Sequence, residues 1–363
     1  GTVLASFFYL LSCILYLRRI HRGRQGVSAA NGYYILALFA FIFALFSKEY
    51  AVSLPLILIL FEGGQSRRLR RGAVKRILPF ILIVIVYLSL FWIYRDNPHY
   101  RDSGQVSILT GERTTDLLTP PLRTYLSTQP RVWVTYLRLF FLPLHQNLDY
   151  DYPLFSSVLI APVIFSLILL AALLLSAVRL SRSSRCRSLP GFCLFWVFIT
   201  LLPESLTPLK DVINEHRLYP ALFGFSLLIP WRLSGLKTGR YFYTVLVVIT
   251  AIFLLLSYRR NLVWMNDLTL WKDVVRKSPG KARPYHNLGL AYARRGEWEE
   301  AIAEYQRSLE REPRFHKSHN NLGLALAASD DYELAVREFE KAVNLRPDYL
   351  PAYNNLASAA LER

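Results

Sequence analysis

The chain has 363 residues, of which 53% are hydrophobic and 14% aromatic, and its formal net charge is +17. This composition is too apolar for a single soluble domain. The charge is unevenly spread, because the first 258 residues hold 26 basic against 11 acidic side chains and the remainder holds 17 against 15.

Residues 1–258 contain apolar stretches of the length that a membrane-spanning helix needs. A helix requires about 20 residues to cross the ~30 Å hydrocarbon layer of a bilayer. The pattern predicts an all-α, polytopic membrane domain with about eight spans. They lie near 2–17, 31–47, 50–62, 77–94, 155–178, 190–205, 216–231 and 241–258.

Four short basic loops between these spans contain no acidic residue. The positive-inside rule places such loops in the cytoplasm, so the segment after Tyr258 emerges on the other side. We therefore expect a multi-pass protein of the inner membrane whose C-terminal part is periplasmic. Because these cations orient the spans, no nucleic-acid partner is expected. The loops carry Arg18, Arg19, Arg22 and Arg24; Arg67, Arg68, Arg70, Arg71, Lys75 and Arg76; Arg179, Arg182, Arg185 and Arg187; and Arg232, Lys237 and Arg240.

Residues 95–154 form a long outer segment of mixed character. A polar stretch is followed by Pro120-Pro121 and then by aromatic residues interleaved with arginine. An interfacial or re-entrant helix on the outer leaflet fits this pattern. A genuine short span over 131–143 is the alternative, and it would turn all the later basic loops outward.

After Tyr258 the sequence repeats with a period of 34 residues. The recurring positions are a Leu-Gly pair, an alanine, a large aromatic residue and a proline, as in Leu288-Gly289, Ala301, Tyr305 and Pro313, then Leu322-Gly323, Ala335, Phe339 and Pro347. Small residues let the two helices of a hairpin touch, and proline ends the second helix. These are the marks of tetratricopeptide repeats. The sequence predicts an α-solenoid over 259–363, with a half repeat at 262–281, repeats at 282–315 and 316–349, and the start of another at 350–363.

Ionisable side chains gather at 203–220, at an outer membrane boundary. Such a grouping is costly unless the charges pair or bind something polar. Lys210, His216 and Arg217 are the candidates to hold a phosphate headgroup, since arginine offers paired hydrogen bonds to phosphate. Glu215 is placed to orient His216 or Arg217. The alternative is a structural Glu–Arg bridge that clips the loop.

Two further groups could contribute to the same polar cavity. Lys48 and Glu49 lie in a short turn between two hydrophobic segments, where the alternative is simple snorkelling of the lysine to water. Gln129, Arg131 and Arg138 belong to the outer segment and are candidates to line the cavity.

Asp149 and Asp151 stand two residues apart, as in some sites for a hydrated divalent cation. Two carboxylates are too few to define a metal site, and turn-forming carboxylates are the alternative. No metal site is therefore assigned, although a divalent metal stays possible as a cofactor.

Three segments carry a resemblance to one family: SKEYAVSLPLILILFE at 47–62, YLSTQPRVWVTYLRLFFLPLHQNLDYDYP at 125–153 and PLKDVINEHRLYPALFGF at 208–225. Followed by the repeats, they resemble the bacterial relatives of the transmembrane and tetratricopeptide-repeat-containing O-mannosyltransferases, which are GT-C class glycosyltransferases. The resemblance implies a GT-C-like helical bundle that transfers a sugar from a polyprenyl-phosphate carrier to a protein hydroxyl on the outer membrane face. The repeats are then expected to present the polypeptide acceptor.

The resemblance also implies an acidic catalytic motif in the first outer loop. The opening residues from Gly1 resemble the family's sequence several spans in, so the catalytic acid is expected upstream of Gly1. No catalytic residue is assigned within the chain. The alternative function is a non-catalytic, membrane-anchored tetratricopeptide-repeat scaffold for envelope or pilus assembly.

Overall fold

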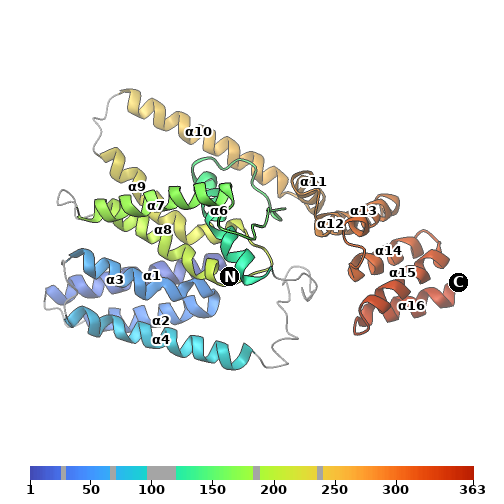
Figure 1. Ribbon diagram of the computed structural model, residues 1–363, viewed down its shortest axis with the longest axis horizontal. Coiled ribbons are helices and arrows are strands. Elements are labelled where there is room, and N and C mark those ends of the chain that lie inside the picture. The colour runs from blue at the N-terminus through green and yellow to red at the C-terminus, as the bar shows by residue number, and fades with distance from the viewer. Residues whose placement is uncertain (26–29, 66–70, 96–119, 183–188, 235–239) are drawn as a thin grey trace. The chain divides into compact units, whose positions relative to one another are not determined.

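The computed structural model describes residues 1–25, 30–65, 71–95, 120–182, 189–234 and 240–363. These residues form helices and irregular segments with no strand, which confirms the predicted all-α fold (Figure 1). The chain divides into two compact units. Unit 1 comprises Gly1–Leu142 and Pro153–Lys237, and unit 2 comprises Pro143–Tyr152 and Thr238–Arg363.

Unit 1 is a bundle of long apolar helices. Tyr9, Tyr16, Phe41 and Phe80 are almost completely buried and lie in one hydrophobic core with Trp196. The helices are α1 (Thr2–Arg24), α2 (Ala30–Ser47), α3 (Leu54–Gln65), α4 (Arg71–Arg95), α6 (Leu122–Phe141), α7 (Ala161–Arg182), α8 (Leu189–Leu206) and α9 (Tyr219–Ser234), and two short 3₁₀ helices, η1 (Glu49–Ser53) and η2 (Glu215–Leu218), precede α3 and α9.

Six helices within the described residues are long and apolar enough to cross a membrane, namely α1, α2, α4, α7, α8 and α10 (Arg240–Val263). The predicted spans at 50–62 and 216–231 correspond to α3 and α9, which have 12 and 16 residues. The apolar window of α10 has none of its residues buried within the protein. Such a surface is stable in lipid rather than in water.

The outer segment is only partly described, because residues 96–119 lie outside the described part of the chain. So do six of the seventeen basic-loop residues, which fall in 66–70, 183–188 and 235–239. Arg18, Arg19 and Arg22 lie in the last turns of α1, not in a loop. The predicted interfacial helix is α6, whose residues Tyr125 and Val132 are completely buried against the bundle.

Unit 2 contains the repeats as helical hairpins. After α11 (Asp267–Lys277) come α12 (Ala282–Ala293) with α13 (Trp298–Arg311), α14 (His316–Ala327) with α15 (Tyr332–Leu345), and α16 (Leu350–Glu362). The backbone also repeats, because Gly296 and Asp330, 34 residues apart, both have positive φ at the turn inside a hairpin. Unit 2 further includes α10 and residues 143–152, whereas the sequence pattern predicts both within the membrane part at 1–258.

Candidate functional site

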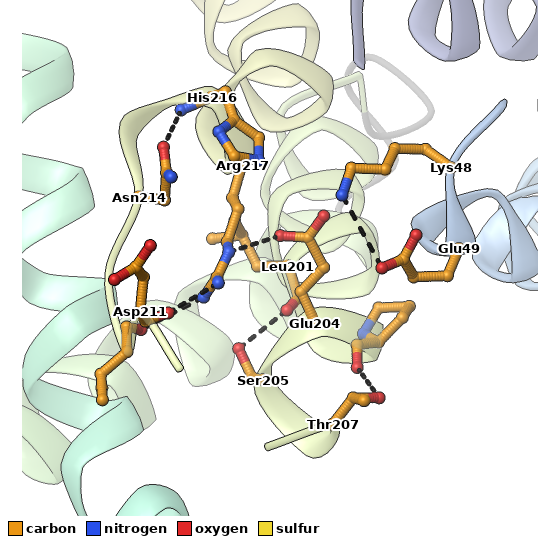
Figure 2. A network of polar contacts seen from close by, with 12 residues as sticks. Lys48, Glu49, Leu201, Glu204, Ser205, Thr207, Asp211, Asn214, His216 and Arg217 are labelled. Carbon is orange, nitrogen blue, oxygen red and sulfur yellow. Dashed lines mark hydrogen bonds and ion pairs between the residues drawn. The ribbon is translucent and has the colours of Figure 1, made fainter. Parts of the chain in front are cut away.

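In unit 1 the turn at 47–55 and the loop at 203–220 meet. The 3₁₀ helix η1 packs against α8, which carries Glu204 near its C-terminal end. Lys48 and Glu49 form an ion pair, with 3.7 Å between Nζ and Oε1. Figure 2 shows Lys48 and Glu49 on one side of Glu204 and Arg217 on the other. We call Lys48, Glu49, Glu204, His216 and Arg217 the charged cluster.

The centre of the charged cluster is a buried ion pair. Arg217 Nε lies 3.1 Å from Glu204 Oε2, and both side chains are over nine-tenths buried. The Arg217 guanidinium also donates to the carbonyl oxygens of Asp211, at 2.7 Å, and Val212, at 3.2 Å. Among the described residues, neither carboxylate oxygen of Glu204 accepts a hydrogen bond of good geometry. The pair is therefore held by charge, while Glu204 keeps capacity to accept further hydrogen bonds.

Helix α6 holds the loop that carries this pair. The Tyr125 hydroxyl donates to the Glu204 carbonyl oxygen at 2.7 Å, and the Trp133 indole donates to Ser205 Oγ at 2.6 Å. The Tyr136 hydroxyl donates to the Asn214 carbonyl at 3.0 Å and accepts from the Asn214 N–H at 3.1 Å. Three aromatic side chains on one helix thus fix both ends of the loop between Glu204 and Asn214.

His216 lies in η2, just before α9. Its backbone N–H is capped by the Asn214 side chain at 3.3 Å. Burial, together with the positive charges of Lys48 and Arg217, lowers the pKa of His216 to about 4. Near neutral pH the imidazole is therefore uncharged, so it can offer a hydrogen bond to a ligand but no positive charge.

The other predicted site residues are placed differently. Lys210 and Glu215 are half-buried in the same loop and η2. Gln129 is buried on α6, and its Nε2 has no hydrogen-bond partner among the described residues. Arg138 is exposed near the end of α6, where it lines an apolar cavity instead of the charged cluster.

The Asp149 carboxylate forms its ion pairs within unit 2. It is almost completely buried and forms ion pairs with Lys281 and Arg283, at the start of α12. Burial raises the pKa of Asp149, but the hydrogen bonds and charges of Arg283 and Lys281 outweigh it and hold that pKa below its usual value. Within the described residues, no cluster of three or more His, Cys, Asp or Glu side chains could hold a metal ion. Asp149 therefore attaches residues 143–152 to the start of α12, a role that neither the metal-site nor the turn-forming interpretation included.

Two residues that matter in this geometry were not selected as site residues from the sequence. Glu204 lies in the charged segment 203–220, but the sequence pattern does not single it out, because its partner stands 13 positions away and no helical spacing links the two. Tyr136 gave no signal beyond its place in an aromatic segment. The signal that could have found Glu204 is an acid within an otherwise apolar predicted span.

Comparisons with known proteins identify the repeats and give a distant likeness for the chain. Residues 286–349 match the family model of the tetratricopeptide repeat. The protein O-mannosyl-transferase Tmtc3 of Drosophila melanogaster is 28% identical over 107 residues, which is 27% of this chain and only 12% of that protein.

The matching solved structures have lower sequence identity to this chain. They include the TPR2B domain of yeast Sti1 in complex with pHsp70, at 21% identity over 30% of this chain and 90% of that one, with a TM-score of 0.27. MamA matches at 23% identity over 26% of this chain and 55% of its own, with a TM-score of 0.25. The family-model match therefore shows that the chain contains tetratricopeptide repeats, and a segment of 107 residues is distantly similar to part of Tmtc3.

Proposed function

We propose that the complete protein is an integral-membrane glycosyltransferase. It moves a sugar from a polyprenyl-phosphate-linked donor to a protein hydroxyl on the outer membrane face, and the repeats present the polypeptide acceptor. The observation that carries this proposal is the charged cluster, where two segments about 150 residues apart in sequence bring Lys48, Glu204 and Arg217 together in an apolar bundle. The distant similarity to Tmtc3 supports the same reaction class.

The proposed reaction forms a bond between the acceptor oxygen and the anomeric carbon of the sugar. The bond from that carbon to the carrier phosphate oxygen breaks, and a general base takes the hydroxyl proton. Negative charge then grows on the departing lipid phosphate. Arg217 stabilises this charge together with Lys210, and neutral His216 donates a hydrogen bond. Glu215, Lys48, Glu49 and Gln129 shape the surrounding polar cavity.

The buried ion pair also favours the second candidate function. If Arg217 serves only to bridge Glu204 and clip the loop, the membrane part is a non-catalytic anchor. The repeats would then recruit partner proteins in envelope or pilus assembly. The two functions differ in whether Arg217 contacts a ligand, and this difference can be measured.

The test uses membranes that contain the protein expressed from its full coding sequence. Labelled polyprenyl-phosphate sugars are added, and transfer of label to protein is scored. Removing one partner of a buried pair leaves an unpaired charge and destabilises by about 3–5 kcal/mol. Arg217→Ala alone therefore cannot separate folding from function, and a double variant is needed.

The informative variant is Glu204→Leu with Arg217→Met, which removes both charges and puts apolar side chains of comparable volume in their place. Replacing a buried ion pair in this way is often close to neutral for stability. We expect this variant to purify as a monodisperse protein with wild-type thermal stability and to lose transfer about 100-fold or more. Wild-type transfer by the folded double variant would contradict the phosphate role of Arg217. Absence of transfer by the wild-type protein with every donor supplied would favour the scaffold.

A further inference from the structure

Unit 1 contains an apolar cavity that the proposed function does not use. Its volume is about 430 Å³, within the usual range for small-molecule sites. Its walls come from α6, α7, α8 and α9, with Trp133, Leu173, Phe198 and Phe225 among them. Apart from Arg138, the hydroxyl of Tyr136 and the indole N–H of Trp133, which donates to Ser205, the side chains that line it are apolar. The Tyr136 hydroxyl is already bonded to Asn214.

The setting of the cavity points to a hydrocarbon ligand. Helices α7 and α8 are both long and apolar enough to cross a membrane. Cavities with such walls stay dry, because a water molecule would find no hydrogen-bond partners inside. Two lining residues, Phe141 and Leu169, are 63% and 44% exposed, so the cavity reaches the outer surface of the bundle. Within a membrane, this surface contacts lipid acyl chains.

One positive charge lies on the cavity wall. Arg138 is in the last turn of α6, is exposed, and forms no ion pair with any other described residue. Arginine side chains near the end of an apolar segment extend toward the lipid headgroups. Their planar guanidinium matches phosphate oxygens with two parallel hydrogen bonds. A basic residue beside a gap between membrane helices is the arrangement expected for an anionic lipid headgroup.

We propose that this cavity is a binding site for one acyl chain of an anionic membrane phospholipid, whose headgroup phosphate contacts Arg138. Arg138 is thus assigned to a structural lipid and not to the sugar donor. The proposal needs only a membrane setting for unit 1, so it does not depend on glycosyltransferase activity. A bound lipid would fill the space between four helices and stabilise the bundle by mass action.

The test compares lipids on the purified, delipidated full-length protein in detergent. Phosphatidylglycerol and phosphatidylcholine with identical acyl chains are added separately. Bound lipid is counted by native mass spectrometry, and the unfolding midpoint is measured. We expect phosphatidylglycerol to be retained and to raise the midpoint by about 5 °C. Equal retention and equal midpoints with both lipids would overturn the role of the headgroup.

Variants separate the headgroup contact from the cavity. Arg138→Gln should weaken retention of phosphatidylglycerol about tenfold and leave phosphatidylcholine unaffected. Leu173→Trp should fill the cavity and reduce retention of both lipids. Arg131→Gln is the matched control, because Arg131 is exposed on the same helix but does not line the cavity. If Arg131→Gln weakens binding as much as Arg138→Gln, the site is general surface charge and the proposal fails. Displacement of phosphatidylglycerol by an equimolar polyprenyl phosphate would also overturn it, because the cavity would then belong to the sugar donor.

Discussion

At the scale of single residues, the ion pairs of Asp149 with Lys281 and Arg283 have a directly measurable effect on stability. The Asp149 carboxylate is buried, while its partners Lys281 and Arg283 remain 30% and 28% exposed. We predict that Asp149→Asn lowers the local stability of α12 by about 1–3 kcal/mol. This is less than for a fully buried pair, because the two cations regain contact with water. Hydrogen exchange of peptides from 278–293 should accelerate about tenfold.

The pH dependence of this contact has a definite sign. The pKa of Asp149 is lower in the folded protein than in the unfolded chain, where it is about 3.9. The stabilisation is therefore complete above pH ~4 and is lost as the pH falls through the lower folded-state pKa. The difference in exchange between wild type and Asp149→Asn should shrink in acid. A matched control is Asp348→Asn, which removes a largely exposed partner of Arg346. It should change stability by under ~0.5 kcal/mol at any pH, and an equal effect of both variants would contradict the prediction.

At the scale of the helical hairpin, two glycines set the distance between paired helices. A methyl group on Gly289 would lie 2.8 Å from the Tyr305 ring, and one on Gly323 would lie 2.7 Å from the Phe339 ring. Both rings are almost completely buried. We predict that Gly289→Ala destabilises the repeats by about 1–3 kcal/mol, although alanine favours a helix by about 0.5–1 kcal/mol over glycine.

Thermal unfolding of the purified protein and hydrogen exchange in α12 and α13 measure this effect. Adding Tyr305→Leu to Gly289→Ala should restore part of the lost stability, because the smaller side chain leaves room for the methyl group. Gly32→Ala in α2 is the control, since its added methyl group would meet no atom within 4 Å. If Gly289→Ala is as well tolerated as Gly32→Ala, the close approach does not determine the hairpin geometry.

Elements also differ in how far the sequence could predict them. The repeats follow from local chemistry, because each proline, alanine and aromatic residue recurs at a spacing that the chain displays directly. Arg217 shows the limit. The sequence pattern indicated its near neighbour Glu215 as a partner, and the arrangement of α8 and α6 brings the distant Glu204 to it. The functional roles of the site residues stay predictions.

Docking of residues 143–152 onto the repeats was beyond sequence reasoning for the same reason. Asn147 and the backbone of Asp149 bond to Ser278, about 130 residues further along the chain. Single-residue partners at such a separation leave no periodic pattern. The short helix α9 is another case, because its length alone does not show whether it crosses a membrane.

At the scale of the whole molecule, the same contacts constrain the number of membrane crossings. Direct hydrogen bonds cannot bridge the ~30 Å hydrocarbon layer, so residues 143–152 and the repeats lie on one side of the membrane. The number of crossings between them must then be even. Of the intervening helices, α7, α8 and α10 pass the length and hydropathy criteria, and α9, with 16 residues, does not. Three crossings would separate Asp149 from Lys281, whereas four would not.

We therefore predict that α9 crosses the membrane although it is only about 24 Å long. A short span of this kind is accommodated by local thinning of the bilayer at modest cost. Single cysteines in a background without the three native ones can be labelled from either side of sealed vesicles. His145→Cys, Thr207→Cys and Arg363→Cys should react from the same side, and a cysteine between α9 and α10 from the opposite side. From Arg232, Lys237 and Arg240, the positive-inside rule predicts that this opposite side is the cytoplasm. Labelling of the α9–α10 connection from the same side as Thr207→Cys would show that α9 does not cross, and the contact between Asp149 and the repeats could not then form in a membrane.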